Sequence, residues 1–506
     1  MDSDHDVLPS CPETIATRDM WRLGIQSRAA AEEYEYPETV LPTSQGNPTG
    51  NECHISDSSP LSPMILSPMD PWRDGNSSPL SVPMATPVSS LMAKQERFLL
   101  YHYMHRVVNL FCVIDNAKSP WKTIHLTRVL QSEGELSIVG STCRIRDALR
   151  KALLSISAFY ISNDYLARKR EGEAKHWEDV ATCFRGDAIG LLKRAMETDL
   201  YSGTRPKYKE FLATMLSMIS INVMSGETST CSVHLDGAEQ LIKHMSRRKS
   251  SFSKKAQSLH RIYYYLRVIY ESTAWPHQNN SSRFSTLLSL QDSPGLDSAD
   301  GLYGAQHISV GTAIPATSAG VRPPEMDTYE FIYGIPQRLL ILLKDAIELI
   351  GLVDNARGKS RSSFIPEELS ISCDELEATI LEWPLDEQLD RCRRLNAGIS
   401  YQIIYYQTRA FYHALVIYFS QNIRLLSYRY LRQYIEAVLE SIEAIEAIKT
   451  QTKILAAPLF WPAFIAATEA FEESHQERFR AWHSAIEVYG IAAARTGIQV
   501  VTEGPA

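Results

Sequence analysis

The sequence predicts an all-α protein, in which a large helical domain follows a disordered N-terminal tail and carries one long internal loop. From about residue 95 onward, apolar residues recur at intervals of three and four, and this spacing places them on one face of an α-helix. The strict alternation that is typical of strands is rare in the same region. Residues 1–94 are instead rich in Ser, Pro, Thr and acidic residues, and few of their segments could form a core. Residues 277–325 are rich in Ser, Gly, Pro and Asp.

The 506 residues are enough for one large core or for two smaller ones, so length does not decide the number of domains. We predict one helical domain over residues 95–503, with a flexible insertion at about 277–325, because neither half shows a fold signature of its own. A loop of this length is also compatible with two domains, and that alternative stays open. The 51 basic and 59 acidic residues leave a net charge of −8, which argues against a chain that coats nucleic acid with its whole surface.

Six helices are predicted before the internal loop, and we expect them to pack as a helical array. Each is predicted from a run of apolar residues with helical spacing. The runs are Leu99, Tyr103, Val107, Leu110 and Ile114; Ile145, Leu149, Ala152, Ile156 and Tyr160; Trp177, Ala181, Phe184, Ala188 and Leu191; Tyr208, Leu212, Met215 and Ile219; Ala238, Leu241, Ile242 and Met245; and Leu259, Ile262, Leu266 and Ile269.

Helical spacing resumes after the loop and leads to an apolar stretch near the C-terminus. The runs there are Phe331, Leu339, Leu343, Ala346 and Ile350, and then Leu431, Ile435, Val438, Ile442 and Ile445. In the charge-poor segment 458–470, Pro462 suits the first turn of a helix, and Trp461 and Phe464 are large enough to anchor packing. The uncharged stretch 454–468 is too short and too rich in proline to span a bilayer, so we predict a buried helix start and no membrane span.

The N-terminal tail contains five serines or threonines that directly precede a proline, and each is a candidate for proline-directed phosphorylation. A phosphate would add roughly −1.5 to −2 charges and could change the choice of partner. A tail that acts only as a linker is the alternative. The five residues are Ser59, Ser62, Ser67, Ser78 and Thr86.

The eight cysteines are widely spaced, and this is the pattern of neither a disulfide framework nor a structural zinc site. The first six residues are acidic and lack the basic flank and apolar run of a secretory signal. We therefore predict an intracellular protein with reduced thiols. The cysteines are Cys11, Cys53, Cys112, Cys143, Cys183, Cys231, Cys373 and Cys392.

A search for catalytic motifs favours a protein that is not an enzyme and that carries no metal or other cofactor. Neither G-x-S-x-G nor H-E-x-x-H is present, and Gly358-Lys359-Ser360 lacks the earlier glycine of a phosphate-binding loop, since that position is Val353. His102 and His105 have a spacing that could share a metal, but we interpret them as surface or boundary histidines. Asp386 and Asp390 are interpreted as a solvated helix face.

A short basic cluster interleaved with serines lies between the fifth and sixth predicted helices. Such runs can serve as nuclear import signals or as patches that contact phosphate. A solvated basic loop is the alternative, because most charge runs are just that. The candidate import residues are Lys243, Arg247, Arg248, Lys249, Lys254 and Lys255.

Four segments, in the same order along the chain, resemble the fungal-specific transcription factor domain family. They are His234–Ile242; the helix from Tyr101 to Asp115 followed by Ser119-Pro120-Trp121; Leu459–Ala466; and Arg478–Gly490, which includes Trp482. The resemblance covers residues 95–503. It implies an all-helical regulatory domain like that of zinc-cluster transcription factors similar to the arginine-metabolism regulator, with Gly237 permitting close helix approach.

The resemblance further implies a nuclear regulator of a metabolic pathway or of a secondary-metabolite gene cluster. Its helical domain would bind a small effector or protein partners, such as the transcription machinery or a DNA-binding regulator. The oligomeric state of this protein stays open, with a homodimer as one alternative. A helical scaffold without a transcriptional role is the alternative. A helical enzyme would need an acidic or nucleophilic constellation that the motifs do not supply.

The N-terminal segment departs from the family, whose members carry a binuclear zinc cluster built from six closely spaced cysteines. Only Cys11 and Cys53 lie there, and two isolated thiols cannot make that cluster. Three explanations stay open: the protein contacts DNA indirectly through a DNA-binding partner, a first exon is missing from the sequence, or regulation does not need the module.

Overall fold

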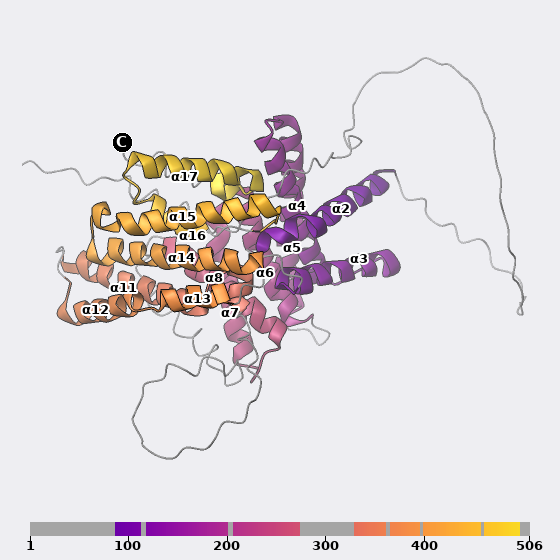
Figure 1. Cartoon of the computed structure of the whole chain (residues 1–506). Coiled ribbons are helices and arrows are strands. Elements are labelled where there is room, and N and C mark those ends of the chain that lie inside the picture. Colours follow the sequence, from indigo (N-terminus) through magenta and orange to yellow (C-terminus); the bar gives the residue numbers. More distant parts are fainter. Residues whose placement is uncertain are drawn as a thin grey trace, which may run out of the picture. The chain divides into compact units, whose positions relative to one another are not determined.

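A computed structural model describes residues 87–112, 118–200, 206–273, 328–360, 365–394, 398–456 and 460–495, and the regular elements in these ranges are all helices (Figure 1). The all-α prediction is therefore confirmed. The five candidate phosphorylation residues and the expected insertion at 277–325 lie outside the described residues. None of the described helices is both long enough and apolar enough to cross a membrane.

The helices from Glu96 onward belong to one compact unit. The elements before residue 274 are α2 (Pro87–His105), η1 (Val107–Phe111), η2 (Trp121–Leu126), α3 (Thr127–Val139), α4 (Arg144–Ala167), α5 (Glu171–Thr198), α6 (Tyr208–Ser225), η3 (Thr228–Thr230), α7 (Cys231–Ser246) and α8 (Lys254–Thr273). In this half, α4 packs along α5 and α6, and α6 in turn contacts α7 and α8.

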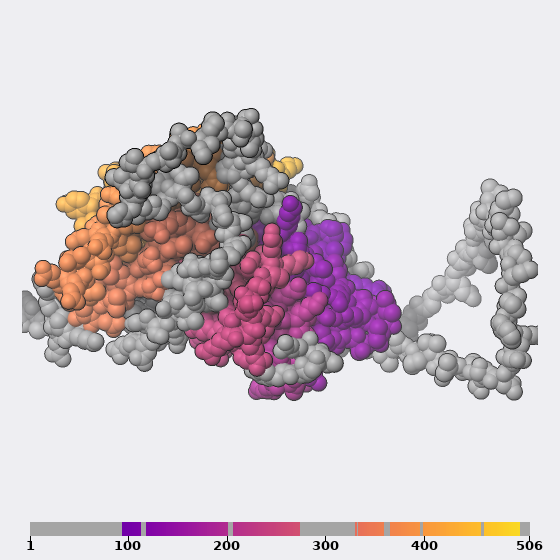
Figure 2. Space-filling model, turned by 90° about the horizontal axis from the view of Figure 1, so that it is seen from below, coloured from indigo at the N-terminus to yellow at the C-terminus, as the bar shows by residue number. Residues whose placement is uncertain are grey.

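The second half continues with α10 (Thr328–Tyr333), α11 (Gln337–Ser360), α12 (Glu367–Leu381), α13 (Leu385–Arg394), α14 (Ile399–Phe419), η4 (Ser420–Arg424), α15 (Tyr428–Thr452), α16 (Phe460–Ala467), α17 (Glu473–Ile486) and η5 (Glu487–Tyr489). Helix α14 lies against α15, α16 and α13, and α11 joins this half to α8. On the face drawn in Figure 2, the pink surface that ends at residue 273 lies between the purple surface of the first helices and the orange surface of the second half.

The predicted helices correspond to observed ones, with two breaks that the apolar spacing does not show. The first predicted helix ends at His105, and a 3₁₀ turn carries Val107 and Leu110 into the core; Ile114 lies outside the described residues. Helix α2 also begins at Pro87, before the expected boundary at residue 95, and proline suits a first helical turn. The run that starts at Phe331 is divided between α10 and α11, because Gly334 takes a positive φ of 69°.

The predicted helix start near the C-terminus is confirmed as buried. Helix α16 begins at Phe460, and its Trp461 and Phe464 side chains are only 3% and 5% exposed. The Trp461 indole N–H donates a hydrogen bond to Ser272 Oγ at the end of α8, with a distance of 2.9 Å. The Trp461 ring also packs on Phe411 of α14, with 4.7 Å between ring centroids. This tryptophan therefore joins three helices that are far apart in the sequence.

A buried amide connects the first and last described parts of the chain. Asn163 on α4 donates from Nδ2 to the backbone oxygens of Met224, at 2.8 Å, and Gly490, at 2.9 Å. Its Oδ1 accepts a hydrogen bond from the guanidinium of Arg495. Asn163 is 6% exposed, so each of these groups would lose water on folding and would be costly to leave unpaired. We refer to Asn163, Met224, Gly490 and Arg495 as the terminal junction.

Two glycines are required by the backbone, one in the terminal junction and one near it, whereas Gly237 is not. Gly490 has a φ of 65°, and a Cβ there would come within 3.3 Å of the Tyr160 ring; Gly226 has a φ of 78°, and its Cβ would come within 3.2 Å of Ala492 Cβ. The prediction that Gly237 permits close helix approach is wrong, because a Cβ there would meet only Met215 Cε at an ordinary 3.8 Å.

We expect Gly490→Ala to destabilise the domain. The left-handed backbone disfavours a side chain by about 1–2 kcal/mol, and displacement of the Tyr160 ring adds to that cost. Gly186→Ala is the matched control, because Gly186 lies inside α5 with nothing within 4 Å of the added Cβ, and alanine there should stabilise the helix by up to about 1 kcal/mol. Urea unfolding of both variants measures the difference. Equal stabilities would contradict the role of Gly490.

Candidate functional site

The predicted basic cluster spans the end of α7, the linker 247–253 and the start of α8. Arg247, Arg248 and Lys249 on the linker are exposed, as are Lys254 and Lys255 in the first turn of α8. Lys243 differs from them, because it is half-buried on α7 and forms an ion pair with Glu239 one turn earlier, at 2.5 Å. Five of the six residues are thus presented to solvent.

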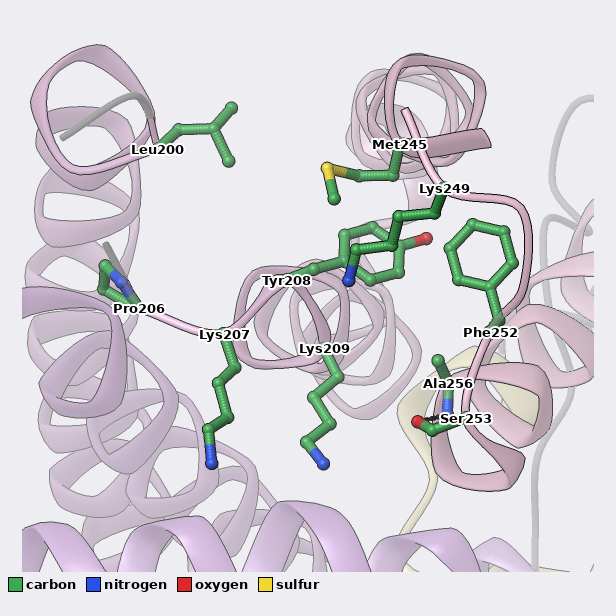
Figure 3. A pocket seen from close by; sticks show the side chains of 10 residues that line it. All are labelled: Leu200, Pro206, Lys207, Tyr208, Lys209, Met245, Lys249, Phe252, Ser253 and Ala256. Atoms are coloured by element: carbon green, nitrogen blue, oxygen red, sulfur yellow. Dashed lines mark hydrogen bonds between the residues drawn. The ribbon is translucent and has the colours of Figure 1, made fainter. Parts of the chain in front are cut away.

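One face of this linker closes a cleft of about 330 Å³, which we call the basic cleft. It lies where the end of α5, the start of α6, the end of α7 and the start of α8 approach one another (Figure 3). It is lined by Leu200, Pro206, Lys207, Tyr208, Lys209, Met245, Lys249, Phe252, Ser253 and Ala256. Three of these residues are lysines and none is acidic.

Aromatic rings fix the inner wall of the basic cleft. Tyr208 Oη and His260 Nε2 are 2.8 Å apart and hydrogen-bonded, and Phe252 packs edge-on against His260, with 4.7 Å between centroids. Burial raises the pKa of Tyr208, so its hydroxyl keeps its proton, and burial lowers the pKa of His260 to about 4. The wall is therefore uncharged at neutral pH.

The positive charges of the cleft come from two directions. Lys207 and Lys209 flank Tyr208 at the start of α6, while Lys249 reaches in from the linker, with its Nζ 6.0 Å from the Tyr208 ring centroid (Figure 3). Within the described residues, none of the three lysines forms an ion pair with a carboxylate. The nearby Glu210 carboxylate is fully buried and is held instead by Arg128, at 3.2 Å, and by Arg146.

The charges also act on one another. The pKa of Lys209 is lowered, first by partial burial and then by the positive charges of Arg128, Lys207 and Lys255. Lys255 contributes from the first turn of α8, where its Nζ donates a hydrogen bond to the backbone oxygen of Thr123, at 3.1 Å. The carboxylate of Glu210 acts in the opposite direction and raises the pKa of Lys209, so the surroundings of Lys209 contain both signs of charge.

A second cleft, of about 520 Å³, lies among α13, α14 and α15. Its lining includes three tyrosines, Tyr401, Tyr405 and Tyr406, and one basic residue, Arg393. The Arg393 guanidinium lies over the Tyr405 ring, 4.9 Å from its centroid, and is paired with Asp390 at 2.9 Å. Because Arg393 is already paired with Asp390, this cleft offers less to a charged ligand than the basic cleft does.

The two histidines considered as metal ligands have different environments. His105 is exposed, whereas His102 is buried, and the expectation of a surface or boundary histidine is wrong for His102. Its Nδ1 lies 3.0 Å from Ser157 Oγ, and burial together with Arg106 lowers its pKa to about 3. It packs between α2 and α4 as a neutral core residue. No metal-binding group of three His, Cys, Asp or Glu side chains occurs in the ranges that the structure describes.

The remaining candidate residues lie on a helix surface or inside a helix. Asp386 and Asp390 are exposed on α13, as expected of a solvated face. Gly358 lies inside α11, so the segment 358–360 ends a helix and is not a phosphate-binding loop. No disulfide joins any two of the six described cysteines, from Cys112 to Cys392. The basic cleft itself was not predicted, because Lys207 and Lys209 are separated from Lys249 by two helices.

Comparison with known proteins gives one family and one curated relative. The model of the family described as "Fungal specific transcription factor domain" matches residues 98–503. "Arginine metabolism regulation protein II" of Saccharomyces cerevisiae is 25% identical over 472 residues, which cover 80% of this chain and 52% of that protein. The chain therefore aligns with about half of the length of this relative. No solved structure matches the chain.

We expect the free energy of unfolding to fall as the pH drops from about 6.5 towards 4. Folded His260 stays neutral down to a pKa of about 4, whereas a histidine in the unfolded chain takes up a proton near pH 6.5. The unfolded state therefore binds more protons in this window, and stability is lost as the pH falls. His260→Gln should flatten the dependence by up to about 1.4 kcal/mol per pH unit.

Chemical denaturation at several pH values measures this slope, with His105→Gln on the exposed surface of α2 as the control. An unchanged slope in His260→Gln would show that His260 takes up its proton without unfolding.

Proposed function

The chain belongs to the fungal specific transcription factor domain family, and from this premise we propose that it is a nuclear regulator of transcription. The family match over residues 98–503 carries the proposal, because it spans nearly all of the described helices. The yeast relative is named for the regulation of arginine metabolism, and this supports control of a metabolic pathway or of a secondary-metabolite gene cluster. A helical scaffold without a transcriptional role is the alternative.

DNA contact by this chain is proposed to be indirect, through a DNA-binding partner. The net charge of −8 opposes broad contact with phosphates, and the exposed linker cations are too few to follow a duplex. The chain aligns with only about half of its yeast relative, so a DNA-reading segment encoded elsewhere in the whole protein stays an alternative.

The exposed linker supports entry into the nucleus. Import signals are short basic runs that a receptor must reach, and Arg247, Arg248 and Lys249 are exposed outside helix α7. No described carboxylate forms an ion pair with these three side chains, so a receptor would not have to break ion pairs in order to bind them. We therefore assign the import signal to this linker, with support from Lys254 and Lys255.

Chromatin immunoprecipitation of the tagged chain, combined with expression profiling of a deletion strain, tests the proposed regulation. A regulator that acts through a DNA-binding partner should be crosslinked to a defined set of promoters, and the genes beside them should change expression on deletion. A scaffold without a transcriptional role gives neither result, and that outcome would overturn the proposal.

Replacing Arg247, Arg248 and Lys249 by Ala is expected to move a fluorescent fusion from the nucleus to the cytoplasm. The fold should be unaffected, because the three side chains are exposed and form no ion pair with any described residue. Microscopy of the fusion measures the ratio of nuclear to cytoplasmic signal.

The matched control replaces Arg168, Lys169 and Arg170 by Ala. This exposed triplet lies in the turn between α4 and α5 and carries the same charge, but Arg168 and Arg170 are paired with Asp164 and Glu173. The control fusion should stay nuclear. Nuclear accumulation of both variants would remove the linker as the import signal.

A further inference from the structure

We propose that Ser250, in the linker between α7 and α8, is phosphorylated by a protein kinase that recognises arginine on the N-terminal side of its target serine. The modification itself depends on the sequence and the exposure of the linker. Its effect, which is to neutralise the import signal, rests on the proposed role of Arg247, Arg248 and Lys249 in nuclear entry. The residue is distinct from the five candidates of the N-terminal tail, each of which precedes a proline.

Four described serines have an arginine three positions earlier, and kinases of this class read such charge patterns. The four are Ser250, Ser251, Ser360 and Ser427. Arginine suits this recognition, because its guanidinium forms two parallel hydrogen bonds with one carboxylate of the kinase. A kinase can make that contact at low cost where the guanidinium is not already bonded within the substrate protein.

The arginines before Ser360 and Ser427 are both bonded within the domain. Arg357 donates from its two terminal nitrogens to two backbone oxygens of η4, at 3.1 and 3.0 Å. Arg424 is paired with two carboxylates of α12. A kinase would have to break these bonds before it could use either arginine, and Ser360 is in addition the last residue of α11.

The two arginines of the linker are not held in this way. The guanidinium groups of Arg247 and Arg248 form no hydrogen bond or ion pair with any described residue, and both side chains are exposed. Their backbone N–H groups bond to oxygens in the last turn of α7, and helix ends open readily. In the described part of the chain, the N–H groups of residues 249–251 donate no hydrogen bond. The linker can therefore be presented to a kinase as an extended segment.

The structure favours Ser250 over Ser251, although both serines follow a suitable arginine. Phe252, directly after Ser251, packs edge-on against His260 with 4.7 Å between centroids, and Figure 3 shows it in the wall of the basic cleft. A kinase that bound Ser251 together with its neighbours would draw this ring out of the wall and expose apolar surface to water. The segment 247–251 around Ser250 is exposed at every position.

The reaction transfers the γ-phosphoryl group of ATP to Ser250 Oγ. The bond between that phosphorus and the bridging oxygen of ADP breaks, a P–Oγ bond forms and the hydroxyl proton leaves, so the products are phosphoserine, ADP and one proton. The phosphate carries about −1.5 to −2 charges, against the positive charges of Arg247, Arg248 and Lys249. Its oxygens can accept charge-assisted hydrogen bonds from the two guanidinium groups, which are then withheld from an import receptor.

Phosphorylation of the purified full-length chain tests the assignment of the residue. The probe is the catalytic subunit of cAMP-dependent protein kinase, an arginine-directed enzyme, supplied with ATP and Mg²⁺, and mass spectrometry locates the phosphate. We expect the phosphate on Ser250 and expect Ser250→Ala to remove most of the incorporation. Arg247→Ala should lower kcat/KM about 10-fold or more, because one charge-assisted contact with the kinase is lost.

Ser251→Ala is the matched control in the same linker and should keep the incorporation. Phosphate on Ser251 or Ser427 in place of Ser250 would overturn the assignment, and so would a chain that the kinase leaves unmodified. An unchanged kcat/KM in Arg247→Ala would show that the linker arginine is not what the kinase reads, and would overturn the proposal as well.

A fluorescent fusion in cells tests the effect on import. Ser250→Asp supplies part of the charge of a phosphate and should shift the fusion towards the cytoplasm, whereas Ser250→Ala should leave it nuclear. Ser141→Asp, at an exposed position between α3 and α4, is the control for added charge and should stay nuclear. An unchanged distribution of Ser250→Asp would overturn the effect on import. The kinase assay uses the purified chain, so its result is independent of whether the linker is the import signal.

Discussion

The buried amide of Asn163 is the constraint on which the arrangement of the helices depends. Its donors bind the backbone at Met224 and Gly490, and its acceptor binds Arg495, so one side chain satisfies groups from α4, α6 and the C-terminal segment. A buried polar group must keep its partners, and these partners lie as many as 332 positions away. The packing of α4 on α6 is therefore linked to the position of the C-terminal segment.

Helix α6 connects this constraint to the basic cleft. Its 18 residues are buried along almost their whole length; Met224 at one end belongs to the terminal junction, and Tyr208 at the other forms the base of the cleft. The fixed part of the cleft is thus built on a rigid core helix. The linker that carries Lys249 is exposed and forms the other wall, so one wall is set by the core and the other is available to an import receptor or to a kinase.

The helices with a clear apolar face, such as α4, α5 and α15, could be predicted from the sequence, because amphipathic spacing reports directly which side is buried. Helices α3, α12, α13 and α14 were not predicted. Helix α14 is apolar on nearly every face and has no polar stripe to mark its period. Gly237 was singled out for its place in a motif. The glycine that the backbone does require, Gly490, can be recognised only from its close approach to Tyr160, which is far away in the sequence. The basic cleft could not be predicted for the same reason. Its lysines are ordinary in sequence, and they line one cleft only because the ends of four helices meet there.

Hydrogen–deuterium exchange of the full chain in increasing urea is the most direct test of the central claim, that the terminal junction makes the described helices one cooperative unit. Mass spectrometry can follow peptides from α6 and from α14 in the same sample. The account predicts that both open with the same free energy and the same dependence on urea. If α14 exchanged through an opening of lower free energy while α6 stayed protected, the two halves would fold separately, and the claim would be contradicted.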